Sequence, residues 1–273
     1  MKTLITHINP HLDDICAIWL FKKFHNYFKD AEIKFLSAAK EGVTYEGKKV
    51  DSDPEVVHFG IGRGKFDEHK GDTLESASSL VWQYIKESGM SPKDEIEFKA
   101  LEELVYWNTL IDTGKAPNYE FSEFSVQSFI RPLDGDEESS KKAIELGEEI
   151  LDRILEVLKR RQQSIKDWEG RQEFQTRYGL TIAVSSETVD RAFCKTKQGD
   201  LFLMYDPKFK SIQFYSDSKD LMNLYEKLKK EDPEASWFLH HSHHMVICGS
   251  SSAPDSKPTK LSLNQLIEVV KFV

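Results

Sequence analysis

Apolar residues in the first part of the chain alternate between short β-prone runs and stretches with helical spacing. Runs at residues 3–8, 33–38 and 56–61 predict strands. Between the first two runs, and again after the third, apolar residues recur about every 3.6 positions, which predicts helices. Strands that alternate with helices predict an α/β fold with a mostly parallel sheet. The predicted helices contain Ile15, Ile18, Trp19, Phe21 and Phe24 in the first case, and cover residues 76–87 and 94–109 in the next two.

A different pattern begins after residue 134. Residues 134–140 are acidic and turn-prone, which predicts a domain boundary. An amphipathic helix with a densely charged outer face is predicted over residues 141–168. Short apolar runs separated by turn signals then predict a smaller α+β domain. Its predicted strands cover residues 180–185, 191–196, 201–205, 211–215 and 237–248, and its predicted helices cover residues 218–231 and 262–272.

The predicted organisation is therefore an α/β protein in three parts. A domain with a mostly parallel sheet covers residues 1–136, a long linker helix covers residues 137–170, and a smaller α+β domain covers residues 171–273. Sites in open parallel sheets form where strands end and loops begin, which directs attention to residues 9–14.

Composition narrows the class of protein. With 39% hydrophobic and 30% charged residues the chain has the composition of a soluble globular protein. No apolar run approaches the ~20 residues of a membrane span, and the β-prone start of the chain predicts no signal peptide. Three cysteines without CxxC spacing predict thiols in a reducing compartment, and hence a cytoplasmic location.

The charge of the chain bears on its partners. A net charge of −9 argues against the salt-dependent coating of a nucleic acid. It favours a small phosphate-containing compound, or a short oligonucleotide held at one site. The sequence leaves a homodimer open.

The first candidate site lies in residues 6–14, Thr-His-Ile-Asn-Pro-His-Leu-Asp-Asp. Two imidazoles, His7 and His11, and two carboxylates, Asp13 and Asp14, fall in one predicted strand-to-helix turn. Mn²⁺ accepts such a mixture of nitrogen and oxygen ligands. An equally good explanation of this segment by itself is that His7 ends the strand and that Asp13 or Asp14 caps the next helix.

Two further segments carry potential metal ligands. After a glycine-rich stretch that begins at Gly60, the chain reads Asp67-Glu68-His69. Glycines let the backbone approach a ligand closely, although a flexible turn followed by surface charges explains the segment as well. Asp112 follows an apolar helical stretch and precedes Thr-Gly, so an aspartate at a helix end is its ordinary explanation.

Taken in order, the three segments resemble the DHH phosphoesterase superfamily, which includes RecJ-like nucleases, oligoribonucleases and family II inorganic pyrophosphatases. Proteins of this superfamily open with a strand and a His-x-Asn-Pro-Asp-x-Asp or His-x-Asp-x-Asp signature. A strand-end Asp, an Asp-His-His motif and a lone Asp follow. The resemblance covers about the first 115 residues. The matching positions are His7, Asn9, Pro10 and Asp13 in the first signature, Asp67 and His69 in Asp-His-His, and Asp112 at the last Asp.

The sequence departs from the superfamily pattern at three positions. His11 stands at the first Asp of the opening signature, and Glu68 stands in the middle of Asp-His-His. Both can still donate a ligand atom. An ungapped match places Gly60 where a strand-end Asp bridges the two ions, and glycine has no side chain to donate. We therefore expect a weakened two-ion site.

The resemblance implies a hydrolase, a phosphoesterase that holds one or two Mn²⁺ or Mg²⁺ ions and activates water between them. An altered DHH-like protein that binds a nucleotide or nucleic acid without cleaving it is the alternative, which Gly60 favours; an unrelated α/β protein with accidental acidic turns is a third possibility. The retained ligands favour the nuclease-like enzyme. The implied metal ligands are His7, His11, Asp13, Asp67, Glu68 and Asp112, with His7 and His11 at one ion, and Asp13, Glu68 and Asp112 at the other. The implied catalytic residues are His69, Asp67 and Asp13, and Arg63 and Lys65 offset phosphate charge.

A last candidate site lies in residues 237–263, where four histidines fall within five positions. On a strand, His240 and His244 would face one side and His241 and His243 the other, which argues against a single site with four histidine ligands. The resemblance implies instead a second domain whose glycine-rich loop grips the substrate, although the Gly-Gly-Gly-His form is missing. A serine-rich surface loop is the alternative. The predicted substrate-binding residues are His240, Ser242, Gly249, Ser250, Ser251 and Lys260.

Overall fold

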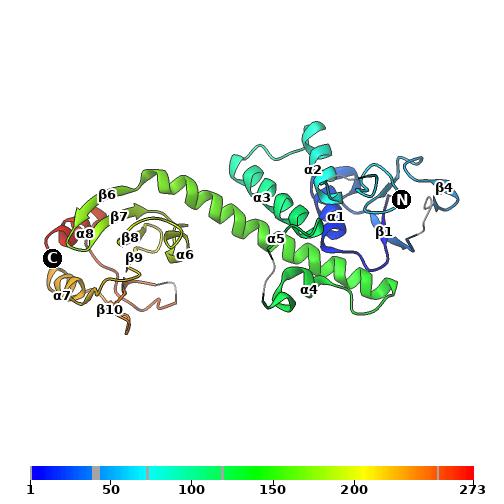
Figure 1. Ribbon diagram of the computed structural model, residues 1–273. Helices are drawn as coiled ribbons and strands as arrows, with labels where there is room; N and C mark the ends of the chain where they lie inside the picture. The colour runs from blue at the N-terminus through cyan, green and yellow to red at the C-terminus, as the bar shows by residue number, and fades with distance from the viewer. Residues whose placement is uncertain (1, 39–43, 72–73, 118–119, 251) are drawn as a thin grey trace. The chain divides into compact units, whose positions relative to one another are not determined.

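The computed structural model describes residues 2–38, 44–71, 74–117, 120–250 and 252–273 (Figure 1). The chain divides into two units, Met1–Lys159 and Arg160–Val273. The division falls inside the helix α5, Glu137–Asp167, which contributes residues to both units. The three-part limits drawn from the sequence stay a prediction.

The sheet of unit 1 has the parallel order β2-β1-β5. Its central strand β1, Thr3–His7, pairs in parallel with β2, Glu32–Leu36, and with β5, Val56–His58. A strand buried on both faces of a parallel sheet reads as a continuous apolar run, which is why β1 could be recognised in the sequence. The predicted parallel α/β sheet is confirmed. A short hairpin of β3, Thr44–Tyr45, and β4, Lys48–Lys49, precedes β5.

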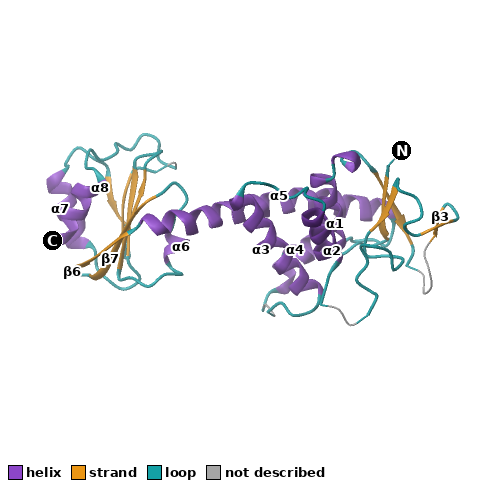
Figure 2. Ribbon diagram, turned by 90° about the horizontal axis from the view of Figure 1, so that it is seen from above, coloured by secondary structure: helices purple, strands orange, loops and turns teal. Residues whose placement is uncertain are grey.

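Helices pack beside this sheet and form the core of unit 1 (Figure 2). The central helix is α1, Leu12–Phe24, and every residue from Leu12 to Phe21 is buried, as expected of a helix that is covered all round. It contacts α2 and α3. Gly147 of α5 lets that helix approach α1, because an added Cβ would lie 2.6 Å from Ile15 Cγ2. The other helical segments are α2 Ala77–Glu87, α3 Glu95–Asp112, α4 Val126–Ile130, and the 3₁₀ turns Asn26–Phe28 and Ser122–Phe124.

The strand order of unit 1 positions the site. From β1 the chain crosses through α1 to β2 on one side, while β5 pairs with the other side of β1. The loops that follow β1 and β5 therefore diverge at the carboxyl end of the sheet, and such a divergence leaves a crevice. Residues 8–11 and 59–69 form these two loops.

Unit 2 holds a six-stranded sheet in the order β10-β11-β9-β8-β7-β6, antiparallel except between β7 and β8. In its core this sheet packs against helices, which agrees with the predicted α+β domain. The strands are β6 Gln172–Thr176, β7 Gly179–Ser185, β8 Leu201–Asp206, β9 Ser211–Tyr215, β10 Trp237–Leu239 and β11 Met245–Cys248, the helices are α6 Arg191–Cys194, α7 Met222–Glu231 and α8 Leu263–Lys271, and the 3₁₀ turn Trp168–Gly170 precedes β6.

Two predicted strands of unit 2 were wrong. Residues 191–196 were expected to form a strand, but α6 begins there, because the Asp190 side chain accepts a hydrogen bond from Phe193 N and caps the helix. Residues 237–248 were expected to form one strand, but they form the hairpin of β10 and β11 with a turn at residues 240–244.

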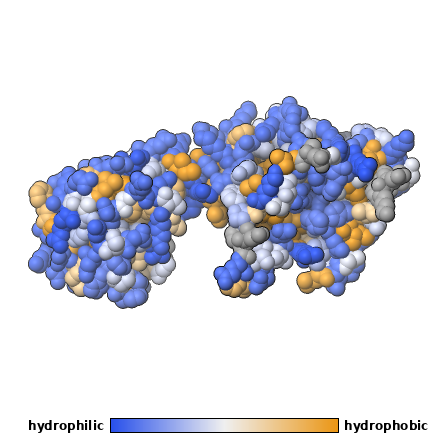
Figure 3. Space-filling model, viewed as in Figure 1, coloured by the Kyte–Doolittle hydropathy of each residue, from blue (hydrophilic) through white to orange (hydrophobic). Residues whose placement is uncertain are grey.

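The surface has an ordinary composition. The face drawn in Figure 3 is mostly hydrophilic, with hydrophobic residues scattered in small groups, as is usual for folded proteins. Among the described residues, no helix combines the length and the apolar character needed to cross a membrane.

His58 at the end of β5 is buried without a partner. The residue is 2% exposed, and within the described chain neither ring nitrogen has a hydrogen-bond partner. Burial lowers the pKa of His58 below its usual value of 6.5. The imidazole is therefore held neutral in the folded protein.

Replacing His58 by leucine is expected to stabilise the protein at acidic pH. Below about pH 6.5 the unfolded chain binds a proton at His58 more readily than the folded chain does, so this group lowers stability as the pH falls. We expect His58→Leu to show a larger gain in urea-unfolding free energy at pH 5 than at pH 7.5. The exposed His241→Leu is the control. An equal gain at both pH values would contradict the assignment of a neutral, buried His58.

Candidate metal centre

A cavity of about 590 Å³ opens at the carboxyl end of the unit 1 sheet. Apart from Ala38, which follows β2, its lining comes from three segments that are far apart in the chain: the loop after β1 with the start of α1, the loop after β5, and the end of α3. Lys65 does not line it, because its Nζ lies over the Tyr84 ring, 3.7 Å from the centroid. All the metal ligands predicted from the sequence line this cavity, namely His7, His11, Asp13, Asp67, Glu68 and Asp112, together with His69, Arg63 and Asp14.

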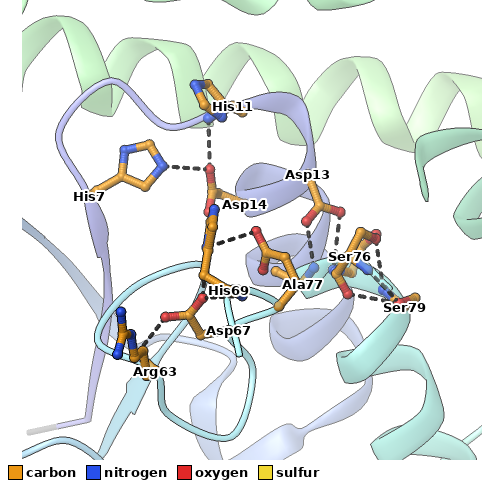
Figure 4. A network of polar contacts seen from close by, with 12 residues as sticks. His7, His11, Asp13, Asp14, Arg63, Asp67, His69, Ser76, Ala77 and Ser79 are labelled. Atoms are coloured by element: carbon orange, nitrogen blue, oxygen red, sulfur yellow. Dashed lines mark hydrogen bonds and ion pairs between the residues drawn. The ribbon is translucent and has the colours of Figure 1, made fainter. Parts of the chain in front are cut away.

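The first wall is built by the turn from β1 into α1 (Figure 4). His11 occupies the N-cap position of α1, and its backbone N–H donates to Asp14 Oδ2 at 2.8 Å. The same oxygen lies 3.0 Å from His7 Nε2. His7 Nδ1 lies 2.7 Å from the Ile8 carbonyl oxygen, so both ring nitrogens of His7 face acceptors. This turn therefore holds two imidazoles around one buried carboxylate.

The environment of His7 favours its charged form. Burial opposes protonation, but the hydrogen bond to Asp14 and the negative charge of that carboxylate outweigh it and raise the pKa of His7 to about 9. A histidine binds a metal through a neutral nitrogen, so an ion at His7 must displace a proton.

Asp13 points away from Asp14 and ties three helices together. It is 3% exposed, and its carboxylate accepts hydrogen bonds from Ala77 N at 2.6 Å, Ser78 N at 3.1 Å and Asn108 Nδ2 at 2.6 Å. The first two donors belong to the N-terminus of α2, and Asn108 belongs to α3. Asp13 therefore lines the cavity and also accepts backbone N–H groups of α2, whereas the sequence offered it as a cap of the helix that directly follows β1.

The second wall is the loop after β5, and Asp67 organises it. Asp67 accepts hydrogen bonds from Arg63 N at one oxygen and from His69 N, at 3.0 Å, at the other. His69 Nδ1 lies 2.8 Å from the same Asp67 Oδ1. Burial of Asp67 opposes ionisation, but these N–H groups and His69 lower its pKa. Asp67 therefore stays ionised and fixes the His69 ring.

The remaining carboxylates of the cavity repel one another. Burial raises the pKa of Asp13 to about 7, and the charges of Asp112 and Asp14 add to this effect. Burial also raises the pKa of Glu68 to about 7, with contributions from Asp14 and Asp112, and raises the pKa of Asp112. Glu68 Oε2 is buried, and the described residues offer it no hydrogen-bond partner. A cation among these groups would relieve both the repulsion and the unpaired oxygen.

The donor sets fit divalent ions. Three groups have ligand atoms that all lie within 4.8 Å of one another: His7, His11 and Asp14; Asp13, Glu68 and Asp112; and Asp67, Glu68 and His69. The first mixes nitrogen and oxygen donors as Mn²⁺ accepts, and the second offers oxygen alone, as Mg²⁺ or Mn²⁺ prefers. This grouping matches the division between two ions that the sequence suggested, with Asp14 added.

Asp14 was not among the predicted ligands, because the sequence explained it as a cap. The signal that could have revealed it is the spacing from His11, since an acidic residue at the third helical position folds back toward the N-cap. That direction brings the Asp14 carboxylate to the end of β1 and to His7.

The predicted substrate-binding residues of unit 2 lie around the β10–β11 hairpin. The histidines occupy a turn and not a strand, so the predicted alternation of faces was wrong; His243 has φ +57° and His244 Nδ1 donates to the Lys219 carbonyl at 2.9 Å. His240 Nδ1 lies 2.8 Å from Ser242 Oγ. Gly249 and Ser250 follow β11 directly, the Lys260 backbone N–H donates to Asp232, and Ser251 lies outside the described residues. Substrate binding by these residues stays a prediction.

Comparison with known proteins gives matches at the level of structure. No family model and no curated protein matches the chain. RecJ from Thermus thermophilus, in complexes with Mg²⁺ and with Mn²⁺, matches 99% of this chain with TM-score 0.35 and 10% identity. The match covers 49% and 52% of those chains, so this chain spans about half of the RecJ chains it matches.

Two smaller proteins also match. An exopolyphosphatase-related protein from Bacteroides fragilis covers 98% of this chain and 89% of its own, with TM-score 0.25 and 11% identity. A putative family II inorganic pyrophosphatase from Methanococcus jannaschii covers 99% of both chains, with TM-score 0.21 and 15% identity. Because these scores and identities are so low, the matches carry no argument about the chemistry of the site. That chemistry follows from the side chains of this chain alone.

Proposed function

We propose that this chain is a metal-dependent phosphohydrolase that cleaves a phosphoester of a short oligonucleotide or of a small phosphorylated compound. The observation that carries the proposal is the meeting of Asp13, Glu68 and Asp112 from three distant segments in one cavity. Burial raises their pKa values, the negative charges of neighbouring carboxylates add to this effect, and both disfavour the ionised site. The arrangement is explained if divalent cations bind there.

The ligand groups define what cations would do in this cavity. Ions held by His7, His11 and Asp14 on one side and by Asp13, Glu68 and Asp112 on the other would polarise a phosphoryl oxygen and make water more acidic. A divergent site of this kind does not require Asp67 as a ligand. Asp67 instead holds the loop and the His69 ring, through the hydrogen bonds described above.

His69 and Arg63 have the positions to act on the substrate. His69 Nδ1 is held by Asp67, which leaves Nε2 free to donate a proton to the leaving oxygen. Burial opposes protonation of His69, but the hydrogen bond to Asp67 and the charge of Glu68 outweigh it and raise its pKa, which favours the protonated imidazole. The exposed Arg63 lines the same cavity and can pair with phosphate oxygens.

The size and charge of the site support the substrate class. A cavity of about 590 Å³ has the size of a site for one small molecule or a few nucleotides. The chain carries a net charge of −9, so a phosphorylated substrate must be attracted locally, by the ions and Arg63. Manganese as the ion, the cytoplasmic location and a possible homodimer stay predictions.

The protein purified with Mn²⁺ is expected to hold two ions per chain and to hydrolyse a phosphoester. Elemental analysis gives the metal content, and short RNA and DNA oligomers, pyrophosphate and small phosphodiesters form the substrate panel. EDTA should abolish hydrolysis, and added Mn²⁺ should restore it. Metal binding without hydrolysis of any compound would favour the alternative, a protein that binds a nucleotide without cleaving it. A protein that binds no divalent ion would contradict both.

A further inference from the structure

The space beside Gly60 is filled by the side chain of Asp14. Gly60 is buried just after β5 with φ +59°. A Cβ added to Gly60 would lie 1.9 Å from Asp14 Oδ1 and 3.1 Å from Asp14 Cγ. No side chain can therefore stand at position 60 while the Asp14 carboxylate is in place.

The two oxygens of Asp14 have different surroundings. Oδ2 accepts the hydrogen bond from His11 N and pairs with His7 Nε2, so it serves the helix cap and the histidine group. Oδ1 is the atom directed at Gly60, and in the described part of the chain no hydrogen bond reaches it. Capping of α1 uses only one carboxylate oxygen, Oδ2, so the Oδ1 atom of Asp14 stays available to a second ligand group.

Asp14 also faces the second ligand group. It lines the same cavity as Asp13, Glu68 and Asp112, which together form the all-oxygen group. The same residue belongs to the group with His7 and His11. Asp14 thus borders both groups, and it is only 4% exposed.

We infer that Asp14 is the carboxylate that the two ligand groups share, and that Gly60 lacks a side chain because the Asp14 carboxylate occupies its place. The bridging group that Gly60 cannot supply comes from the first turn of α1 instead. This inference rests on the proposed function, because it assigns a role within the same metal centre.

Asp14→Asn tests the shared ligand directly. Asparagine keeps an oxygen that accepts the His11 N–H, so the cap of α1 is retained while the charge is lost. We expect the variant to unfold at nearly the wild-type temperature but to bind Mn²⁺ more than about 100-fold more weakly, beyond the 10–100-fold effect of an outer-shell change. Calorimetric titration measures the affinity, and electron paramagnetic resonance detects the magnetic coupling between neighbouring Mn²⁺ ions, which should disappear.

Asp94→Asn is the matched control, because Asp94 caps α3 in the same unit by accepting a hydrogen bond from Glu97 N. It should leave both Mn²⁺ affinity and coupling unchanged. Wild-type binding and coupling in Asp14→Asn would overturn the inference while leaving the proposed function in place. A wild-type chain that binds no Mn²⁺ would overturn both.

Moving the carboxylate from position 14 to position 60 provides the stronger test. Asp14→Ala removes the shared ligand, and Gly60→Asp alone places two carboxylates in the same space, so each single variant should lose coupled Mn²⁺ binding. The double variant frees the space and restores a carboxylate, at a backbone position with positive φ that aspartate tolerates better than most residues. We expect it to recover coupled binding to within about tenfold of wild type. A folded double variant that binds Mn²⁺ no better than Asp14→Ala would overturn the inference that the Asp14 carboxylate takes the place of a ligand at position 60.

Discussion

Asp112→Asn is expected to lower kcat for phosphoester hydrolysis by about 100- to 1,000-fold without destabilising the protein. Asp112 is the last residue of α3, exposed to the cavity. A negative charge at the C-terminus of a helix opposes the helix dipole, so the charge contributes nothing favourable to folding there. Its repulsion also raises the pKa of Asp13. An unfavourable charge in this place is explained by a cation that it helps to hold.

Hydrolysis rates at saturating Mn²⁺, Mn²⁺ affinity and thermal unfolding check this prediction together. Glu87→Gln is the matched control, because Glu87 is the exposed last residue of α2 and does not line the cavity. It should leave the rate unchanged. If Asp112→Asn retained both wild-type turnover and wild-type Mn²⁺ binding, Asp112 would not belong to a metal centre.

The metal-free protein is expected to lose stability as the pH rises, and Mn²⁺ is expected to restore it. Asp13 has a pKa of about 7 in the folded state against 3.8 ordinarily, so between these values the folded chain binds more protons than the unfolded chain and stability falls with pH. Each pKa unit corresponds to about 1.4 kcal/mol, so the rise of about 3 units at Asp13 alone accounts for a loss on the order of 4 kcal/mol. His7, whose pKa is raised to about 9, contributes stability below pH 6.5 that is lost as the pH rises toward 9.

Urea unfolding in EDTA and in Mn²⁺ at pH 5, 6.5 and 8 measures the effect. The stabilisation by Mn²⁺ should grow with pH, because ions bind the deprotonated ligands. In metal-free Asp112→Asn the loss of stability between pH 5 and 8 should be smaller, since one repelling charge is gone. A Mn²⁺ stabilisation that is independent of pH would contradict the raised pKa values of this cavity.

The sequence revealed the elements whose patterns are local. Strand β1 is a continuous apolar run because it is buried on both faces, and α1 is apolar all round because other elements cover it. Strand β6 escaped notice because it is a mostly exposed edge strand of polar residues. The short helix α6 resembled a strand, since four residues hold too little periodicity to distinguish the two and only the cap at Asp190 separates them.

The sequence indicated which residues line the cavity but not how they are arranged. The predicted ligands do line one cavity, because the carboxyl ends of parallel strands meet at the same edge of a sheet. What the sequence could not show is that Asp14 lies against Gly60, since that proximity depends on how α1 packs beside β5. Gly60 indicated a lost ligand in the sequence, and in the structure its missing side chain leaves room for the Asp14 carboxylate.

The helix α5 has a consequence for any attempt to separate the two units. The division between Lys159 and Arg160 falls within its 31 residues, where the backbone hydrogen bonds run on without a loop. A protease that requires extended chain is therefore offered no substrate at that point, and a fragment ending there would leave the carbonyl groups of its last turn unpaired. The chain should be cut either before Glu137 or after Asp167, so that one of the two fragments keeps α5 whole.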